Sequence, residues 1–338
     1  MLSQAPAAPI GDEAVAIAFA PLERADTLLL AISGGPDSTA LALLAARWAR
    51  APGRPGLHAA TVDHRLRQEA GAESAAVARF CASLGIVHHA LSWRGDKPQS
   101  RLQERAREAR YALLGECAKT IGAPIIVTAH HADDQAETVL FRLLRGSNIA
   151  GLAGMSAATP RHGFILARPL LPFYKEALIA VCEAAGAPSA HDLSNENPRF
   201  ARVRMRALLR QEGLSAPSLL RLARRAGQVE QALGVFTATA RRRLGDAPEI
   251  DAKALFAEPR EIAQRIIGAK IAALASPPSR ELRLEALEAL VEALDGASRD
   301  GRRHKANLAG VSVSLDAAGI IRFAAEAARR NNSSSAGA

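Results

Sequence analysis

Residues 28–44 read LLLAISGGPDSTALALL, which is an apolar run, a polar turn and a second apolar run. The first run lacks polar alternation, which predicts a strand buried on both faces. From Ser38 the apolar residues recur at helical spacing, so we expect a helix to begin there. The two glycines between these elements allow a tight turn whose amides face an anion, and the helix dipole adds positive character. The stretch therefore predicts a strand, an anion-binding loop and a helix.

The loop matches neither of two common nucleotide-binding motifs. No Gly-Lys-Ser/Thr follows it, and G-x-G-x-x-G is absent. Ser33 and Ser38 are expected to donate hydrogen bonds to phosphate oxygens, and Asp37 to hold a Mg²⁺ ion that binds them. The structural alternative is an ordinary turn in which Asp37 or Ser38 caps the helix.

Short apolar runs and helical patterns alternate through the first half of the chain, which predicts a doubly wound parallel sheet of the α/β class. The expected strands are 27–32, 57–62, 86–91 and 124–129, with an edge strand within 164–171. The expected helices begin at 38 and 133 or span 73–84, 102–121 and 175–185.

Helical patterns dominate the second half. They cover 202–211, 218–244, 258–274 and 281–294, and the second of these helices is expected to break near Gly227 and Gly234. Residues 309–324 alternate apolar and polar residues around a turn, which predicts a β-hairpin. We therefore expect a first domain at 1–213, a mainly helical second domain with a small β-hairpin at 217–330, and a disordered tail at 331–338.

Composition narrows the classes of partner. The 338 residues suit two domains, and the net charge of +9 with a pI near 10.2 indicates a polyanionic partner, either nucleic acid or an anionic membrane surface. No apolar run is long enough to span a membrane, and the N-terminal stretch is a poor signal peptide, so we expect a cytoplasmic protein without a membrane partner. The widely spaced Cys81, Cys117 and Cys182 predict no disulfide framework, zinc site or iron–sulfur cluster.

Three predicted strands end in polar clusters. These are SGGPDS (33–38), VDHRLR (62–67) and TAHHADDQAET (128–138). In a doubly wound sheet, ligands bind outside the carboxyl ends of the strands. The three clusters therefore predict one shared site.

The SGGPDS loop resembles that of the N-type ATP pyrophosphatases. Together with the other two clusters and HDLSNENPRFARVRMR (191–206), it looks like the tRNA(Ile)-lysidine synthetase family over about residues 25–210. Leu193 and Val203 depart from that family's pattern, where Pro and Asn are usual. The resemblance implies an adenine nucleotide alpha hydrolase-like, PP-loop ATPase fold.

The resemblance also implies a reaction. ATP would activate C2 of the wobble cytidine in a tRNA(Ile) with a CAU anticodon, with release of pyrophosphate. L-lysine would then displace AMP to leave lysidine, which changes codon reading from AUG to AUA. The implied cofactors are ATP and Mg²⁺. The oligomeric state stays open, with a homodimer as one option.

Candidate residues follow from the three clusters and the resemblance. The candidates for ATP binding are Ser33, Gly34, Gly35, Pro36, Asp37, Ser38 and Asp63, with Asp37 also the Mg²⁺ ligand. The catalytic candidates are Asp37, Asp133, Asp134, His130 as proton acceptor, and Arg110 by resemblance. The candidates for lysine or cytidine are Arg65, Arg67, Asp133 and Glu137. The alternatives are helix capping for the aspartates, a core position for His130 and solvated surface for the arginines.

Basic charge is concentrated between residues 199 and 243. This segment has eleven arginines and two acids, so it carries as much net charge as the whole chain. Its one-signed density argues for phosphate contacts over a solvated helix face. The tRNA-binding candidates are Arg199, Arg202, Arg204, Arg206 and Arg210. The resemblance implies a catalytic domain at 1–213 and a tRNA-binding domain at 217–330. The alternative is that these arginines hold their segment against the catalytic domain.

Three competing functions stay open at the level of sequence. A tRNA thiolation enzyme on the same scaffold would need reactive cysteines. A small-molecule synthetase such as NAD synthetase would leave the basic segment without a role. A non-catalytic, ATP-gated RNA-binding protein would need the basic segment but no lysine site.

Overall fold

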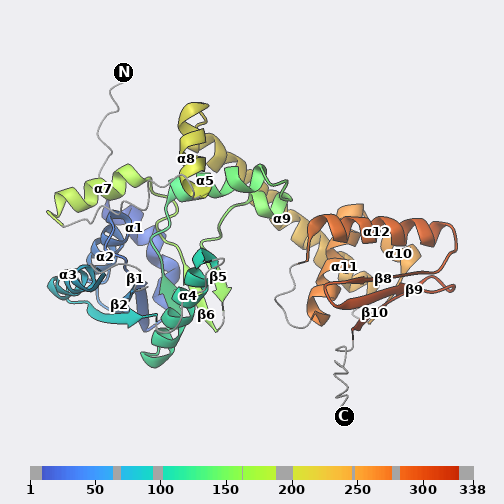
Figure 1. Cartoon of the computed structure of the whole chain (residues 1–338), viewed down its shortest axis with the longest axis horizontal. Coiled ribbons are helices and arrows are strands. Elements are labelled where there is room, and N and C mark those ends of the chain that lie inside the picture. The colour runs from blue at the N-terminus through green and yellow to red at the C-terminus, as the bar shows by residue number, and fades with distance from the viewer. Residues whose placement is uncertain are drawn as a thin grey trace, which may run out of the picture. The chain divides into compact units, whose positions relative to one another are not determined.

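The computed structural model describes residues 10–63, 70–93, 102–161, 163–187, 201–245, 248–275 and 282–326. Contacts divide the chain into two compact units, Met1–Arg225 and Ala226–Ala338 (Figure 1). Helix α9 (Ala216–Leu244) contributes its first residues to the first unit and the rest to the second. The tail at 331–338 lies outside the described residues.

The first unit is built on a six-stranded sheet with the order β3-β2-β1-β4-β6-β5, which confirms the predicted doubly wound α/β class. All neighbours pair in parallel except β5 and β6, which are antiparallel. The strands are β1 (Thr27–Ala31), β2 (Gly56–Asp63), β3 (Val87–Ser92), β4 (Ile125–Val127), β5 (Ala158–Arg161) and β6 (Phe164–Ala167).

The edge of this sheet differs from the prediction. The strand expected at the edge is β6, but it pairs with β4 on one side and β5 on the other. The edge strand is β5, whose sequence ATPR contains Pro160 and shows no strand pattern. Proline lacks the amide that a strand with two partners needs, and an edge strand tolerates that loss.

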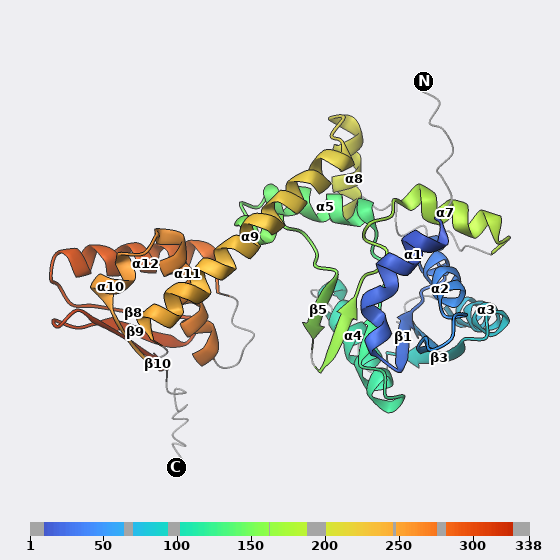
Figure 2. The ribbon, with the colours of Figure 1, turned by 180° about the vertical axis from the view of Figure 1, so that it is seen from behind.

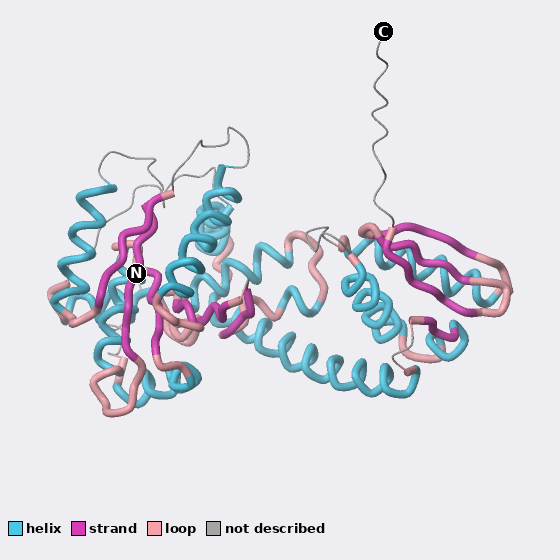
Figure 3. Tube along the Cα trace, turned by 90° about the horizontal axis from the view of Figure 1, so that it is seen from below, coloured by secondary structure: helices cyan, strands magenta, loops and turns pink. Residues whose placement is uncertain are grey.

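Helices cover both faces of the sheet (Figures 2 and 3). One face packs against α1 (Asp12–Phe19), η1 (Ala20–Arg24), α2 (Pro36–Trp48), α3 (Ala70–Ser83) and α7 (Lys175–Ala184). The other face packs against α4 (Leu102–Thr120). Leu28 and Leu30 of β1 enter the first core and Leu29 enters the second, which explains why this strand is apolar without alternation.

A third apolar cluster lies beside the sheet. Helix α5 (Ala132–Leu143) packs through Ala136, Val139 and Leu140 against α8 (Ala201–Gln211) and the start of α9. The short helix α6 (Ile149–Leu152) follows α5, and Arg142 ties the two together by donating to the carbonyls of Gly151 and Gly154. This packing brings the arginine-rich α8 to the side chains at the start of α5.

The second unit is a four-stranded antiparallel sheet with helices. Its strand order is β7-β10-β9-β8, so the predicted hairpin, β9 and β10, is the centre of a larger sheet. The elements are β7 (Glu249–Asp251), α10 (Ala252–Phe256), α11 (Arg260–Leu274), α12 (Leu284–Arg299), β8 (His304–Leu308), β9 (Val311–Leu315) and β10 (Ile320–Ala325).

Helix α9 runs unbroken through Gly227 and Gly234, where the sequence suggested a break. Each glycine costs a helix about 1 kcal/mol relative to alanine. Leu233, Ala240 and Leu244 bury apolar surface in the core of the second unit, and this packing outweighs the cost.

In the part of the chain that the structure describes, no helix combines the length and apolarity that crossing a bilayer requires.

Burial of β1 on both faces yields a stability prediction. Leu29→Ala and Leu30→Ala should each lower the free energy of unfolding by about 2–5 kcal/mol, because each leaves a cavity in a different core. Ile165→Ala in β6 should cost much less, since Ile165 is 41% exposed. Urea unfolding of the three variants makes the comparison, and a loss for either leucine as small as that for Ile165 would contradict two-sided burial.

Candidate active site

The SGGPDS loop joins β1 to α2 and depends on a glycine at position 34. Gly34 has a φ of +87°, and an added Cβ would lie 3.1 Å from Cγ2 of Val77. Helix α2 begins at Pro36, with Gly35 as its N-cap, and not at Ser38. Neither Asp37 nor Ser38 caps it, so the structural alternative of a capped turn is wrong and the first amides of the helix have no side-chain acceptor.

Ser38 holds the loop together. Its hydroxyl donates to the carbonyl of Gly35 at 2.9 Å and accepts from the amide of Ser33 at 3.1 Å. The two serine hydroxyl oxygens also lie 3.2 Å apart. Ser38 is buried and its one hydroxyl proton is used within the loop, so shaping the loop is its visible role. That these serines donate to phosphate stays a prediction.

Asp37 points from the start of α2 toward α5, and its Oδ1 is buried without a hydrogen-bond partner among the described residues. Burial favours the neutral carboxyl, but His131, Lys175 and Arg206 outweigh it and lower the pKa of Asp37. A charged carboxylate with a buried, unused oxygen beside a phosphate-type loop fits Mg²⁺, which takes few protein oxygens together with phosphate oxygens. Among the described residues, no group of three or more His, Cys, Asp or Glu could hold a metal by itself.

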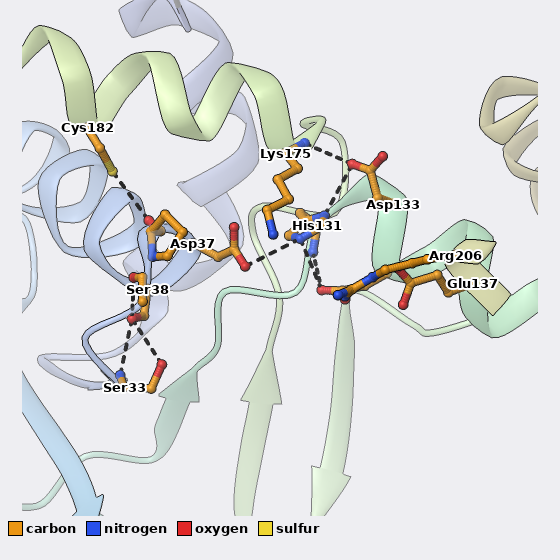
Figure 4. Close-up of polar contacts among 12 residues, drawn as sticks. Ser33, Asp37, Ser38, His131, Asp133, Glu137, Lys175, Cys182 and Arg206 are labelled. Carbon is orange, nitrogen blue, oxygen red and sulfur yellow. Dashed lines mark hydrogen bonds and ion pairs between the residues drawn. The ribbon is translucent and has the colours of Figure 1, made fainter. Parts of the chain in front are cut away.

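His131 lies at the centre of the site, among three carboxylates (Figure 4). Its Nε2 is 3.6 Å from Oδ2 of Asp37 and 3.6 Å from Oδ2 of Asp134, and its Nδ1 is 3.4 Å from Oδ2 of Asp133. The side chain is 1% exposed. Burial disfavours the imidazolium, but the carboxylates outweigh burial and raise the pKa of His131 to about 9.

Sequence reasoning chose the neighbouring His130 and missed His131. His130 is half-buried, and its Nδ1 lies 2.8 Å from Oγ1 of Thr128. The pair lies two residues beyond the end of β4 at Val127, and His131 has an extended backbone, in which adjacent side chains point to opposite sides. The sequence alone does not show which of the two histidines faces the SGGPDS loop.

The carboxylates of α5 differ in their partners. Asp133 accepts a hydrogen bond from the backbone amide of Lys175 at 2.8 Å. Asp134 accepts one from the amide of His131, the N-cap residue of α5, at 3.2 Å, so it has the capping role expected for one of the pair. Glu137 pairs with Nε of Arg206, whose Nη2 lies 3.9 Å from Oδ1 of Asp134.

A pocket of about 400 Å³ opens beside this cluster. Its charged lining is His131, Asp133, Glu137, Lys175, Arg206 and Arg210. Its apolar lining is Ala136, Leu209, Leu214 and Ala216. Lys175 begins α7, and its side chain runs toward Asp37 in Figure 4. The sequence did not indicate that Lys175 would line a pocket, because its only distinguishing feature is its place after a strand and a loop.

The remaining candidates are dispersed. Asp63 ends β2, half-buried. Arg204 and Arg210 are exposed on α8, whereas Arg206 is half-buried among the acids of α5. Arg110 is half-buried on α4 and does not line the pocket. Arg65, Arg67 and Arg199 lie outside the described residues, as does the side chain of Arg202.

Comparisons with known proteins agree with this architecture. Residues 12–212 match a family model described as a PP-loop domain. A tRNA(Ile)-lysidine synthase of Rhodopseudomonas palustris is 46% identical, with 88% of this chain and 90% of that protein covered. A tRNA(Ile)-lysidine synthase of a Methylobacterium species is also 46% identical, with 91% of each chain covered.

A solved structure with a similar fold is the U34-tRNA thiolase of Methanococcus maripaludis with its [4Fe-4S] cluster. The TM-score is 0.52 at 17% identity, and the match covers 63% of this chain and 77% of that one. At this identity the likeness concerns the fold alone.

The raised pKa of His131 predicts how stability depends on pH. A group whose pKa rises on folding, here from 6.5 to about 9, stabilises the fold fully below pH 6.5 and loses that effect as pH rises through about 9. At pH 6, His131→Gln should therefore be less stable than the parent by on the order of 3 kcal/mol. Urea unfolding should show this gap closing by pH 10, and a gap independent of pH would contradict a buried imidazolium.

Proposed function

This chain belongs to the tRNA(Ile)-lysidine synthase family of PP-loop proteins, and from that premise we propose that it joins L-lysine to C2 of the wobble cytidine in a CAU-anticodon tRNA(Ile). ATP would be cleaved to AMP and pyrophosphate through an adenylated tRNA. The observation that carries the proposal is the contact of Asp37, from the SGGPDS loop, with His131 at the wall of a charged pocket. A nucleotide site and an amino-acid site would share that contact.

The loop would bind the triphosphate through backbone amides. Gly34 and Gly35 permit close approach, and the uncapped start of α2 favours negative charge. Asp37 would hold Mg²⁺, which when bound neutralises phosphate oxygens and eases departure of pyrophosphate. Donors held in place by the fold can stabilise charge that develops on the phosphate without reorganising during the reaction.

The pocket suits lysine because it combines charges of both signs with an aliphatic wall. Asp133 is 39% exposed and can accept an ammonium group, whereas Arg206 and Arg210 can receive a carboxylate. Leu209 and Leu214 would cover the four-carbon stem of the substrate. A pocket with these three features discriminates against amino acids that lack a terminal cation.

Lysine must lose a proton before its ε-amine attacks, and His131 is a poor acceptor for that proton. It is already protonated at neutral pH. Burial alone would lower its pKa, but the surrounding carboxylates outweigh burial and raise the pKa to about 9. The acceptors that we propose are a carboxylate of the cluster and His130. His131 would instead help to lower the pKa of Asp37 and of Asp133 and hold both carboxylates in position.

The buried cysteines favour lysine transfer over thiolation. Burial raises the pKa of Cys81 and Cys182 to about 11, and it also raises the pKa of Cys117. All three thiols are buried, so they lack the exposed thiolate that sulfur transfer needs.

The basic helix α8 would serve two roles. Arg204 and Arg210 are exposed and remain the candidates for contacts with tRNA phosphates. Arg206 bonds to Glu137 and approaches Asp134, which favours the alternative that it fastens α8 to α5. The roles of Asp63, Arg65, Arg67, Arg110, Arg199 and Arg202 stay predictions.

Incubation of the protein with ATP, a CAU-anticodon tRNA(Ile) and labelled lysine tests the reaction. We expect lysine in the tRNA and one pyrophosphate released per lysine. Asp37→Asn should lower the rate by at least about 100-fold, because it removes the charge that would hold Mg²⁺, while tRNA binding persists. If no labelled lysine appears in the tRNA, the proposed reaction is wrong. If Asp37→Asn turns over at a near-normal rate, Asp37 does not hold a Mg²⁺ ion that the reaction needs.

Asp133→Asn tests the lysine pocket. Asparagine can still accept the hydrogen bond from Lys175, so the change removes the charge and keeps this link to α7. The KM for lysine should rise by about 10-fold or more, the size expected for a charged hydrogen bond, while pyrophosphate release during adenylation persists. Asp12→Asn, which alters a surface ion pair with Arg47, is the matched control. An unchanged KM would place the amino acid elsewhere.

A further inference from the structure

Four arginines gather around Tyr111 on the α4 side of the sheet, away from the carboxylate cluster. Helix α4 supplies Arg107 and Arg110, β5 supplies Arg161, and Arg168 directly follows β6. Among the described residues, none of the four forms an ion pair with a carboxylate. The acid next to them on α4, Glu108, pairs with Arg105 instead.

Two of these guanidinium groups lie against the ring of Tyr111. Cζ of Arg161 is 4.3 Å and Cζ of Arg107 is 5.2 Å from the ring centroid. Tyr111 is itself buried. Such contacts hold the arginines in place, but they do not neutralise their charge.

The deeper arginines are incompletely paired. Arg168 is 8% exposed, and its Nη1 donates to the carbonyl of Ser156 at 2.7 Å and to Oγ1 of Thr159 at 3.0 Å. Nε of Arg168 and Nε of Arg161 are buried without a partner in the described structure. A buried cation with an unused donor destabilises a fold unless an anion approaches it.

The lowered pKa values of two of these arginines also indicate a site that an anion would stabilise. Burial lowers the pKa of Arg110 and of Arg168, and repulsion from Arg107 adds to both shifts. Arg161 further repels Arg168. Like charges held this close are costly, and an anion with several oxygens would relieve the repulsion of all four.

The cluster extends down the side of the sheet. Arg168 follows the carboxyl end of β6, whereas Arg161 pairs with Phe164 at its amino end. The SGGPDS loop follows the carboxyl end of β1, which runs parallel to β6 through β4. Arg161 therefore lies at the opposite end of the sheet from the nucleotide loop, while α4 runs alongside (Figures 1 and 2).

We propose that this arginine cluster binds a backbone phosphate of the tRNA, with Arg107 and Arg161 in contact with it and Arg110 and Arg168 supplying charge from behind. Arg107 is exposed and Arg161 is half-buried, so both are accessible, and guanidinium groups match phosphate oxygens in geometry. The choice of tRNA rests on the proposed function, since the anion that a tRNA-modifying enzyme meets away from its nucleotide loop is the RNA backbone.

The test is tRNA binding by the full chain across a salt series. Arg107→Gln and Arg161→Gln should each weaken binding and reduce the slope of log K against log salt by about 1. Arg105→Gln is the matched control, because it removes the same charge from the same helix at a residue already paired with Glu108. Cognate and non-cognate tRNAs should lose affinity equally.

Two further measurements separate a phosphate site from a structural role. Inorganic pyrophosphate, at constant ionic strength, should raise the thermal midpoint of Arg161→Gln less than that of the parent. A lower midpoint with an unchanged salt slope would overturn the proposal, because the arginines would then only pack on Tyr111. A raised KM for ATP with an unchanged salt slope would assign the anion to the nucleotide and overturn the tRNA assignment.

The outcome does not depend on whether lysine transfer is correct. If the parent binds tRNA but transfers no lysine, the proposed function fails and the salt slopes still decide the phosphate site. If the parent transfers lysine and neither variant changes its slope, the phosphate site fails and the proposed function stands. Saturating tRNA should restore full turnover to both variants, because neither residue lines the pocket.

Discussion

The first unit depends on one buried cation among three buried or half-buried carboxylates. His131 approaches Asp37 from α2 and Asp133 and Asp134 from α5, so it joins the element that follows β1 to the element that follows β4. Without its charge, the three aspartates would face one another with no cation between them. With it, the SGGPDS loop and the start of α5 are held close together. Asp133 extends the link to α7 by accepting the amide of Lys175.

Charge is balanced differently in two parts of the same unit. Around the pocket, acids and bases alternate, and Glu137 with Arg206 fastens α8 to α5 beside the Asp37–His131 pair. Around Tyr111, four arginines gather, and none of them pairs with a carboxylate among the described residues. The first arrangement suits a zwitterionic amino acid, because each of its charged groups finds a partner of opposite sign. The second suits a polyanion, because only a ligand of one sign relieves it.

The helices, strands and motifs of the catalytic half could be predicted because they rest on local patterns. The apolar run at Leu28–Leu30, the glycines of the loop and the polar strand ends follow from backbone sterics and from the rule that parallel strands share a carboxyl edge. The prediction from sequence failed where a strand or a side chain takes its place only through contacts with residues distant in the chain. Strand β5 forms only because β6 offers it an edge, and His131 is distinguished from His130 only by the side of the chain to which each points.

By itself, then, the sequence determined a PP-loop α/β unit and a basic segment at 199–243, since each depends on residues adjacent in the chain. Tertiary structure alone decided which charges meet. Arg206 lies among a run of arginines that looks like an RNA-binding surface, yet its guanidinium turns to Glu137, 69 positions earlier in the chain. Arg161 and Arg168 stand far from α4 in sequence and gather on Tyr111 because β5 and β6 fold against that helix. Electrostatic partners are chosen by distance in space, and distance in space is fixed only when the sheet and its helices have packed.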